Sequence, residues 1–273
     1  MNRRDFLKRS LVYGGTTGLA IMGTGAAASL ISACTASDKY DAVIANGWIY
    51  AGDGKEPLLG SVGIKGGKIA AIGNLGSIED LRRECKTVVD AKEMAVTPGF
   101  IDIHSHSYTN YFDCPLGDSR IYQGITTEVC GNCGDSPFPY SDQKYAEHKD
   151  ELRHGYPYWQ DADGYLDALR KNKVGVNFLS YVGFGMLRSA VVGDNNVPPT
   201  KEQLDKMCQL LDHEMEVGII GMSTGLEYTP DAYASTDEIA ELCKVVAKHN
   251  GLFAIHMRNE DDYVEEAIAE AIE

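Results

Sequence analysis

Basic residues are scarce in this sequence. Its 273 residues include 25 Lys and Arg against 40 Asp and Glu, and the formal net charge is −15 at pH 7. A protein that binds nucleic acid needs a basic stripe to neutralise phosphates, and beyond the first nine residues the Lys and Arg residues form no such stripe. We therefore expect no nucleic-acid partner.

Biased composition and internal repeats are also lacking. With 44% hydrophobic and 24% charged residues, the chain has the composition of an ordinary globular protein, which excludes a disordered chain and a collagen-like fibre. No internal repeat stands out along the sequence. The length suits one large domain or two small ones.

The first 33 residues have the pattern of an export signal. Arg3-Arg4 is followed by Phe6-Leu7 and by an uncharged stretch over residues 10–33, which several glycines make only moderately apolar. This pattern is typical of signals of the twin-arginine type, which would export the protein already folded. The alternative is a transmembrane anchor, because the uncharged stretch is long enough to span about 30 Å of hydrocarbon.

Residues 31–34, Ile-Ser-Ala-Cys, resemble a bacterial lipobox, in which the cysteine becomes the lipid-carrying first residue of the mature protein. The sequence therefore predicts a lipoprotein of the cell envelope, in the periplasm or on the outer surface, that touches the membrane only through a lipid anchor at Cys34. Removal of residues 1–33 takes away four basic side chains and one acidic side chain. The mature chain then has 240 residues, and its net charge changes from −15 to −18.

The cysteines after Cys34 are even in number, which permits disulfides without requiring them at this chain length. Cys208 and Cys243 fall within helical patterns, so we expect them to be small core residues. Cys130 and Cys133 form a C-x-x-C pair, but a redox pair opens a helix, whereas here Cys130 is expected at a strand end and Cys133 in a turn bracketed by glycines. The six residues are Cys85, Cys114, Cys130, Cys133, Cys208 and Cys243.

Residues 38–97 predict part of a small β-sandwich domain. Short β-rich runs alternate with turns, and Gly66-Gly67 is a two-residue hairpin signal, so we expect an antiparallel sheet. The charged segment 79–86 is expected to interrupt the strands. The strand candidates are residues 42–45, 48–50, 62–64, 69–72 and 87–89.

Residues 98–273 alternate between strand and helix patterns, which is typical of parallel βα units. Capping boxes, Thr200 with Gln203 and Ser235 with Glu238, predict the starts of two helices. A (β/α)8 barrel takes about 250 residues, so these strands predict an α/β fold that comprises the N-terminal part of a TIM-like barrel. Loop and short helix are expected over 139–159. The strand candidates are residues 100–103, expected to be buried, 125–129, 176–182, 218–222 and 252–255.

Metal-ligating residue types follow the first two of these strands. His104 and His106 come directly after the first strand at positions i and i+2, so both imidazoles can point the same way at the carboxyl end of the sheet, where barrels keep their active sites. Cys133 lies in a turn between Gly131 and Gly134, and thiolate is a good zinc ligand. Taken alone, the histidines also fit a surface loop, and the cysteine also fits a structural thiol.

Four motifs in order give the chain a family resemblance. Residues 98–106, P-G-F-I-D-x-H-x-H, resemble the opening of the metal-dependent amidohydrolase superfamily. One branch of it, the N-acyl-D-amino-acid deacylases or D-aminoacylases, is similar in residues 124–134, in 218–228 and in the H-x-R-x-E pattern of 256–260. The resemblance runs from about Tyr40 to the last residue.

The resemblance implies zinc-dependent hydrolysis of the amide bond of small N-acyl-D-amino acids by attack of a metal-bound hydroxide. It implies that His104, His106 and Cys133 are ligands of Zn²⁺, as one or two ions. Two further histidine ligands and an aspartate that acts as general base are expected beyond residue 273, which makes this chain the N-terminal half of a longer enzyme. The residues implied to contact the substrate or the metal ligands are His256, Arg258 and Glu260.

Two alternatives to a working deacylase remain open at this point. The chain is an inactive truncated fragment if the missing strands leave its apolar edges uncovered. It is a non-catalytic envelope lipoprotein if it binds a metal or a ligand without turnover.

Overall fold

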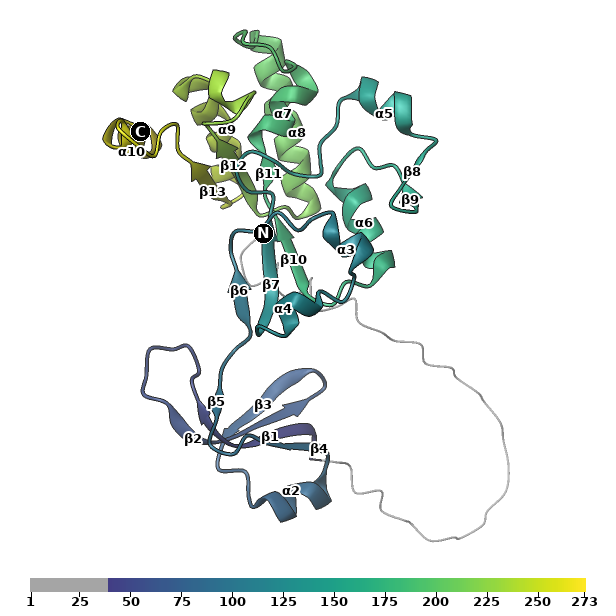
Figure 1. Ribbon diagram of the computed structural model, residues 1–273, viewed down its shortest axis with the longest axis vertical. Helices are drawn as coiled ribbons and strands as arrows, with labels where there is room; N and C mark the ends of the chain where they lie inside the picture. The colour runs from purple at the N-terminus through teal and green to yellow at the C-terminus, as the bar shows by residue number, and fades with distance from the viewer. Residues whose placement is uncertain (1–38) are drawn as a thin grey trace. The chain divides into compact units, whose positions relative to one another are not determined.

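The computed structural model describes residues 39–273, and the chain divides between Pro98 and Gly99 into two compact units (Figure 1). The predicted signal segment, residues 1–33, and the predicted lipidation site, Cys34, lie outside the described residues. Within the described range, no helix combines the length and the apolarity needed to cross a membrane.

The described part of the first unit is built on a five-stranded sheet with the order β3-β2-β1-β4, in which β5 also pairs with β1. β1 pairs antiparallel with β2 but parallel with β4 and β5, so the expectation of a purely antiparallel sheet is wrong. The cause is the charged segment, which forms helix α2 (Ile78–Glu84) and returns the chain to the edge where β1 begins. The strands are β1 (Tyr40–Ile49), β2 (Leu58–Lys65), β3 (Lys68–Gly73), β4 (Cys85–Asp90) and β5 (Ala95–Val96).

The Gly66-Gly67 hairpin is confirmed. Both glycines have positive φ, +58° and +71°, as a type I′ turn between β2 and β3 requires. Buried Tyr40, Val43 and Leu81 belong to the small core of this unit. The second sheet that a sandwich needs is not found among the described residues of the unit, so that part of the expectation stays a prediction.

The second unit has parallel strands that lie side by side in chain order, as in part of a TIM-like barrel. One sheet has the order β10-β7-β6 and the other β11-β12-β13. β10 and β11 belong to one stretch of chain interrupted at Tyr181, whose backbone N–H still donates to the Cys130 carbonyl, so the second sheet continues the first. The strands are β6 (Phe100–Asp102), β7 (Ile125–Cys130), β10 (Asn177–Ser180), β11 (Val182–Gly183), β12 (Gly221–Gly225) and β13 (Leu252–His256).

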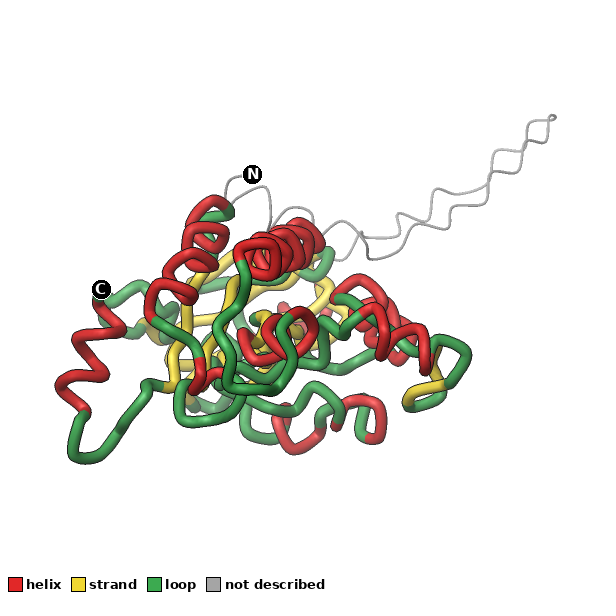
Figure 2. Tube along the Cα trace, turned by 90° about the horizontal axis from the view of Figure 1, so that it is seen from above, coloured by secondary structure: helices red, strands yellow, loops and turns green. Residues whose placement is uncertain are grey.

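Helices α7 and α9 pack against β12, and α9 also packs against β13, whereas α10 lies at the periphery after a loop (Figures 1 and 2). The main core of this unit includes Tyr165, Met207, Leu211, Met222 and Leu242. Residues 139–159, expected as loop and short helix, form α5 (Asp142–His148) and the hairpin of β8 (Leu152–Arg153) and β9 (Tyr156–Pro157). The other helices are α3 (Asn110–Asp113), α4 (Asp118–Ile121), α6 (Ala162–Asn172), α7 (Phe184–Val191), α8 (Lys201–Val217), the 3-10 helix η1 (Asp231–Tyr233), α9 (Thr236–Lys248) and α10 (Val264–Ile272).

Three strand expectations need correction. The strand expected at 176–182 is broken at Tyr181, and the one expected at 218–222 begins only at Gly221, because α8 runs to Val217 and ends at Gly218 with φ +124°. The strand β6 is not buried, since Phe100 is 56% and Ile101 is 60% exposed. It is the edge strand of its sheet and pairs only with β7 among the described residues.

Only one of the two expected capping boxes is complete. At the start of α8 the side chains of Thr200 and Gln203 each bond to the other's backbone. At the start of α9, Ser235 accepts from the Glu238 N–H, but the Glu238 carboxylate accepts instead from Nε of Arg188, at 3.2 Å. Because both members of this ion pair are buried, the Glu238 carboxylate pairs with Arg188 and does not complete the capping box at the start of α9.

Glu214 is a fully buried carboxylate that joins α8 to the start of α6. Its Oε2 accepts from the Ala162 N–H at 2.8 Å, and its Oε1 has no hydrogen-bond partner. Burial raises the pKa of Glu214 to about 8, against 4.5 for a free glutamate. The folded protein therefore favours the protonated form.

We predict that Glu214→Gln flattens the pH dependence of stability. The wild-type chain takes up a proton on folding between pH 4.5 and about 8, so the free energy of unfolding falls as the pH rises through this range. Glutamine carries no charge, and the variant should be about 1–3 kcal/mol more stable than wild type at pH 9, with the advantage lost below pH 4.5. Urea unfolding across pH measures it, with Glu216→Gln on the exposed side of α8 as control. Parallel pH profiles for wild type and variant would contradict the assignment.

Candidate metal centre

The two histidines lie on the segment that directly follows β6. His104 and His106 are exposed and Ser105 and Ser107 are buried, so the alternation of a strand continues past the last residue of β6. The Ser105 N–H donates to the Val129 carbonyl of β7 at 3.0 Å, which keeps the segment beside the sheet. The two imidazole centroids lie 5.6 Å apart, on the same side of the segment.

Cys133 lies in a turn that tolerates no larger residue at its first glycine. Gly131 and Cys133 have φ of +76° and +54°, and a Cβ on Gly131 would lie 2.2 Å from the Tyr181 carbonyl oxygen. Ser223 of β12 fixes the turn from the other side, because its hydroxyl donates to the Gly131 carbonyl at 2.5 Å and accepts from the Gly134 N–H at 3.1 Å. The thiol is therefore presented by a backbone held at both ends.

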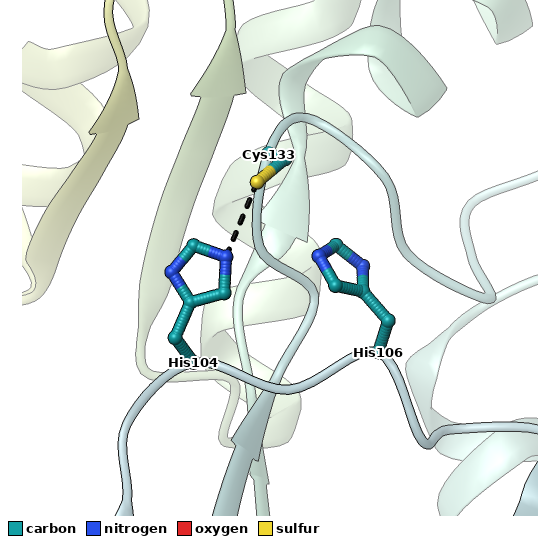
Figure 3. A group of neighbouring side chains, drawn as sticks. All are labelled: His104, His106 and Cys133. Atoms are coloured by element: carbon teal, nitrogen blue, oxygen red, sulfur yellow. Dashed lines mark hydrogen bonds between the residues drawn. The ribbon is translucent and has the colours of Figure 1, made fainter.

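The three predicted ligands converge (Figure 3). Sγ of Cys133 lies 3.3 Å from Nε2 of His104, and one ligand atom from each of His104, His106 and Cys133 lies within 4.8 Å of the others. Tetrahedral zinc, with Zn–S near 2.3 Å and Zn–N near 2.0–2.1 Å, separates its ligand atoms by roughly 3.6 Å. The three atoms fit around one ion after small side-chain rotations, and three protein ligands leave a coordination position open.

The electrostatics around Cys133 favour a cation. Burial raises the pKa of the Cys133 thiol, and the carboxylates of Glu260, Asp135 and Asp231 raise it further. A bound metal ion would oppose this negative field and stabilise the thiolate.

Cys130 does not join the cluster. It is fully buried at the end of β7, where burial raises the pKa of its thiol to about 12. Cys130 and Cys133 form no disulfide, and all six cysteines of the described residues are free. The C-x-x-C spacing therefore places one thiol in the core and the other in the cluster, which does not suit a redox pair. Cys208 and Cys243 are partly buried against the main core, as expected.

An open pocket of about 570 Å³ adjoins the cluster. His106 and Cys133 form part of its wall, and Gly185, Met186 and Tyr228 are among its other lining residues. The acidic residues of the wall are three aspartates, Asp135, Asp194 and Asp231, and no Lys or Arg among the described residues lines it.

Asp231 is the buried member of this acidic wall. It is 3% exposed, its Oδ2 accepts from the Gly225 N–H at 2.8 Å, and burial raises the pKa of its carboxyl to about 8. Gly134 and Gly185 make room for it, because a Cβ on either would lie within 2.2 Å of a carboxylate oxygen of Asp231. Asp135 accepts from the Tyr108 hydroxyl and Asp194 from the Ser189 hydroxyl.

The three residues predicted to contact substrate or ligands lie at and after the end of β13. His256 is the last residue of β13, with Nε2 at 3.3 Å from Glu227 and 3.7 Å from Glu260, and its ring meets Tyr228 edge-on. Arg258 is engaged within the protein, since it pairs with Glu270 and donates to the carbonyls of Ala232 and Ala234. Glu260 is exposed. Their roles toward a substrate stay predictions.

The sequence analysis did not single out Asp135, Asp194 or Asp231. Asp135 directly follows the Cys133 turn, beyond the carboxyl end of β7. Because barrels keep their active sites at this end of their strands, its position in the sequence could have marked it as a candidate site residue. Asp194 reaches the pocket from the loop after α7 and Asp231 from the start of η1, and no local pattern marks either residue.

Known proteins match most of this chain. Residues 87–264 match the profile of the amidohydrolase family. A D-aminoacylase from Alcaligenes xylosoxydans xylosoxydans is 36% identical over 236 residues, which are 86% of this chain and 48% of the relative. An N-acyl-D-glutamate deacylase from the same organism is 35% identical over 86% of this chain and 47% of the relative.

Solved structures agree with the sequence matches. The N-acyl-D-glutamate deacylase from Bordetella bronchiseptica, crystallised with zinc and a phosphonate inhibitor, is similar with a TM-score of 0.76 at 34% identity. The match covers 86% of this chain and 48% of the deacylase chain. A D-aminoacylase crystal structure has a TM-score of 0.74 at 32% identity over 85% of this chain and 48% of its own. The chain spans about half the length of these relatives. The matches confirm the predicted family resemblance and the predicted partial barrel-like α/β fold. The chain belongs to the amidohydrolase family.

Proposed function

We propose that this chain forms the metal-binding half of a zinc-dependent deacylase that hydrolyses the amide bond of N-acyl-D-amino acids. The observation that carries the proposal is the convergence of His104, His106 and Cys133 beside a pocket at the carboxyl ends of parallel strands. The relatives named D-aminoacylase and N-acyl-D-glutamate deacylase support the substrate class.

His104, His106 and Cys133 would hold Zn²⁺, as one or two ions. The bound metal supplies a Lewis acid for the scissile carbonyl and lowers the pKa of water. The chain's own residues hold the substrate, because the pocket wall of Gly185, Met186 and Tyr228 borders the ligands. His256 lies against Tyr228, and we assign it a contact with the substrate or with the residues around the metal.

We predict that Cys133 is required for metal binding. Cys133→Ser replaces the thiolate with a poor zinc ligand and should weaken zinc affinity by more than about 100-fold, since losing even a residue that supports a ligand costs about 10–100-fold. Zinc titration against a chromogenic chelator measures the effect. Cys114→Ser, at an exposed free cysteine, is the matched control and should bind like wild type. Equal zinc affinity in both variants would overturn the metal centre.

The acidic pocket wall also bears on the side chain of the substrate. Asp135 and Asp194 face a space that no Lys or Arg of the described residues lines, so a second carboxylate on the substrate would be repelled. We therefore propose D-amino acids with neutral or basic side chains as the substrates.

We predict that N-acetyl-D-methionine binds the zinc-loaded protein at least about tenfold more tightly than N-acetyl-D-glutamate, a difference of about 1.4 kcal/mol. Calorimetric Kd values measure this without relying on turnover. Asp194→Asn removes one negative charge from the pocket wall and should reduce the ratio of the two Kd values. Asp237→Asn, at an exposed position on α9, should leave this ratio unchanged. Tighter binding of the glutamate derivative would reverse the assignment.

We further propose export by the twin-arginine route and a lipid anchor at Cys34, on the strength of Arg3-Arg4 and the lipobox-like residues 31–34. Cys34→Ser should abolish incorporation of labelled fatty acid and move the protein from the membrane fraction to the soluble fraction of the envelope. Arg3→Lys combined with Arg4→Lys should retain it in the cytoplasm. Unchanged labelling of the Cys34→Ser chain would exclude this anchor.

A further inference from the structure

Glu128 is a fully buried carboxylate in the strand that leads to Cys133. It lies in β7, is 0% exposed, and none of the proposed ligands contacts it directly. Its Oε2 accepts from the Tyr111 hydroxyl, and its Oε1 accepts from Nε of Arg120. An unpaired carboxylate at this depth would be strongly destabilising, so these two donors are what allow it to be charged there.

Arg120 connects this carboxylate to the histidine segment. Its Nε donates to Glu128, and its Nη2 donates to the hydroxyl of Ser107, the residue after His106. The Ser105 hydroxyl, between the two histidines, in turn donates to the Ser107 hydroxyl at 2.9 Å and accepts from the Ser107 N–H at 3.2 Å. One planar guanidinium thus bonds to both β7 and the His-Ser-His-Ser segment in a fixed direction.

We propose that Glu128 and Arg120 are positioning residues for the metal centre, which hold His104 and His106 at the distance from Cys133 that one metal ion needs. β7 carries Glu128 and leads to the turn that holds Cys133, five residues later, whereas Ser107 directly follows His106. The Glu128–Arg120–Ser107 chain therefore ties the elements that supply the two kinds of ligand. The inference rests on the proposed function, since it presumes that the three ligands bind a metal.

The chain offers an internal comparison for this role. Arg188 and Glu238 form a second buried Arg–Glu pair, with an Nε–Oε1 distance of 3.2 Å. Arg188 donates its other hydrogen bonds to the carbonyls of Asn195 and Val197, and the pair has no hydrogen bond to any proposed ligand or to its neighbours in sequence. Loss of either carboxylate removes the acidic partner of an arginine, Arg120 at 31% side-chain exposure or the fully buried Arg188, but only loss of Glu128 releases the histidine segment.

Cobalt binding tests the proposal, because the visible spectrum of Co²⁺ reports both affinity and ligand geometry. Glu128→Gln should bind Co²⁺ about 10–100-fold more weakly than wild type and with altered band intensities, as expected when a supporting residue of a metal ligand is removed. Glu238→Gln should lower the melting temperature similarly yet bind Co²⁺ with wild-type affinity and spectrum. The full chain with its wild-type ligands is used throughout.

A second variant keeps the test decisive if Glu128→Gln does not fold. Ser107→Ala preserves the Glu128–Arg120 pair and removes its bond to the histidine segment, together with the Ser105–Ser107 hydroxyl bond within that segment, so it should weaken Co²⁺ binding and change the spectrum with little effect on melting. Wild-type Co²⁺ binding in Ser107→Ala, or equal losses in Glu128→Gln and Glu238→Gln, would overturn the positioning role while leaving the metal centre intact. Absence of Co²⁺ binding by the wild-type chain would overturn both this proposal and the proposed function.

Discussion

Parallel pairing between β6 and β7 determines where the side chains of the proposed metal ligands lie. Asp102 is opposite Glu128, so the chain leaves both strands at the same edge of the sheet and His104 follows β6 within reach of the turn that follows β7. Parallel strands that share a sheet always bring their carboxyl ends together, and here that edge receives two imidazoles and a thiol. Cys130, the last residue of β7, is buried in the core. A shift of register by one residue would exchange the exposed histidines for the buried serines.

The buried carboxyl groups of the second unit are stabilised in different ways. Glu128 and Glu238 each have an arginine partner, whereas Glu214 and Asp231 rely on backbone N–H donors and favour the protonated form. The paired carboxylates connect elements that are distant in the sequence, such as α7 with α9. The unpaired ones cap a helix start or fill the space left by glycines. This division follows from the cost of desolvating an ion, which a guanidinium offsets more fully than a single backbone N–H does.

The sequence was sufficient for the features that depend on local patterns. Gly66-Gly67 predicted the hairpin, Thr200 and Gln203 predicted the start of α8, and the i, i+2 spacing predicted that His104 and His106 face one way. Features that depend on distant partners could not be predicted. The Glu238 carboxylate left its expected cap because Arg188 reaches it from another helix, and Asp231 enters the pocket wall because Gly134 and Gly185 leave room for it.

The acidic wall of the pocket has a consequence for the rates of encounter. Asp135 and Asp194 beside the proposed metal ligands, on a chain whose net charge is −15, attract divalent cations from a distance and slow the approach of anions. Every N-acyl-D-amino acid with a free carboxylate is such an anion. Charges beyond about 10 Å are screened at 0.1 M salt, so rising ionic strength should slow the capture of the proposed metal ion and speed the arrival of the proposed substrate.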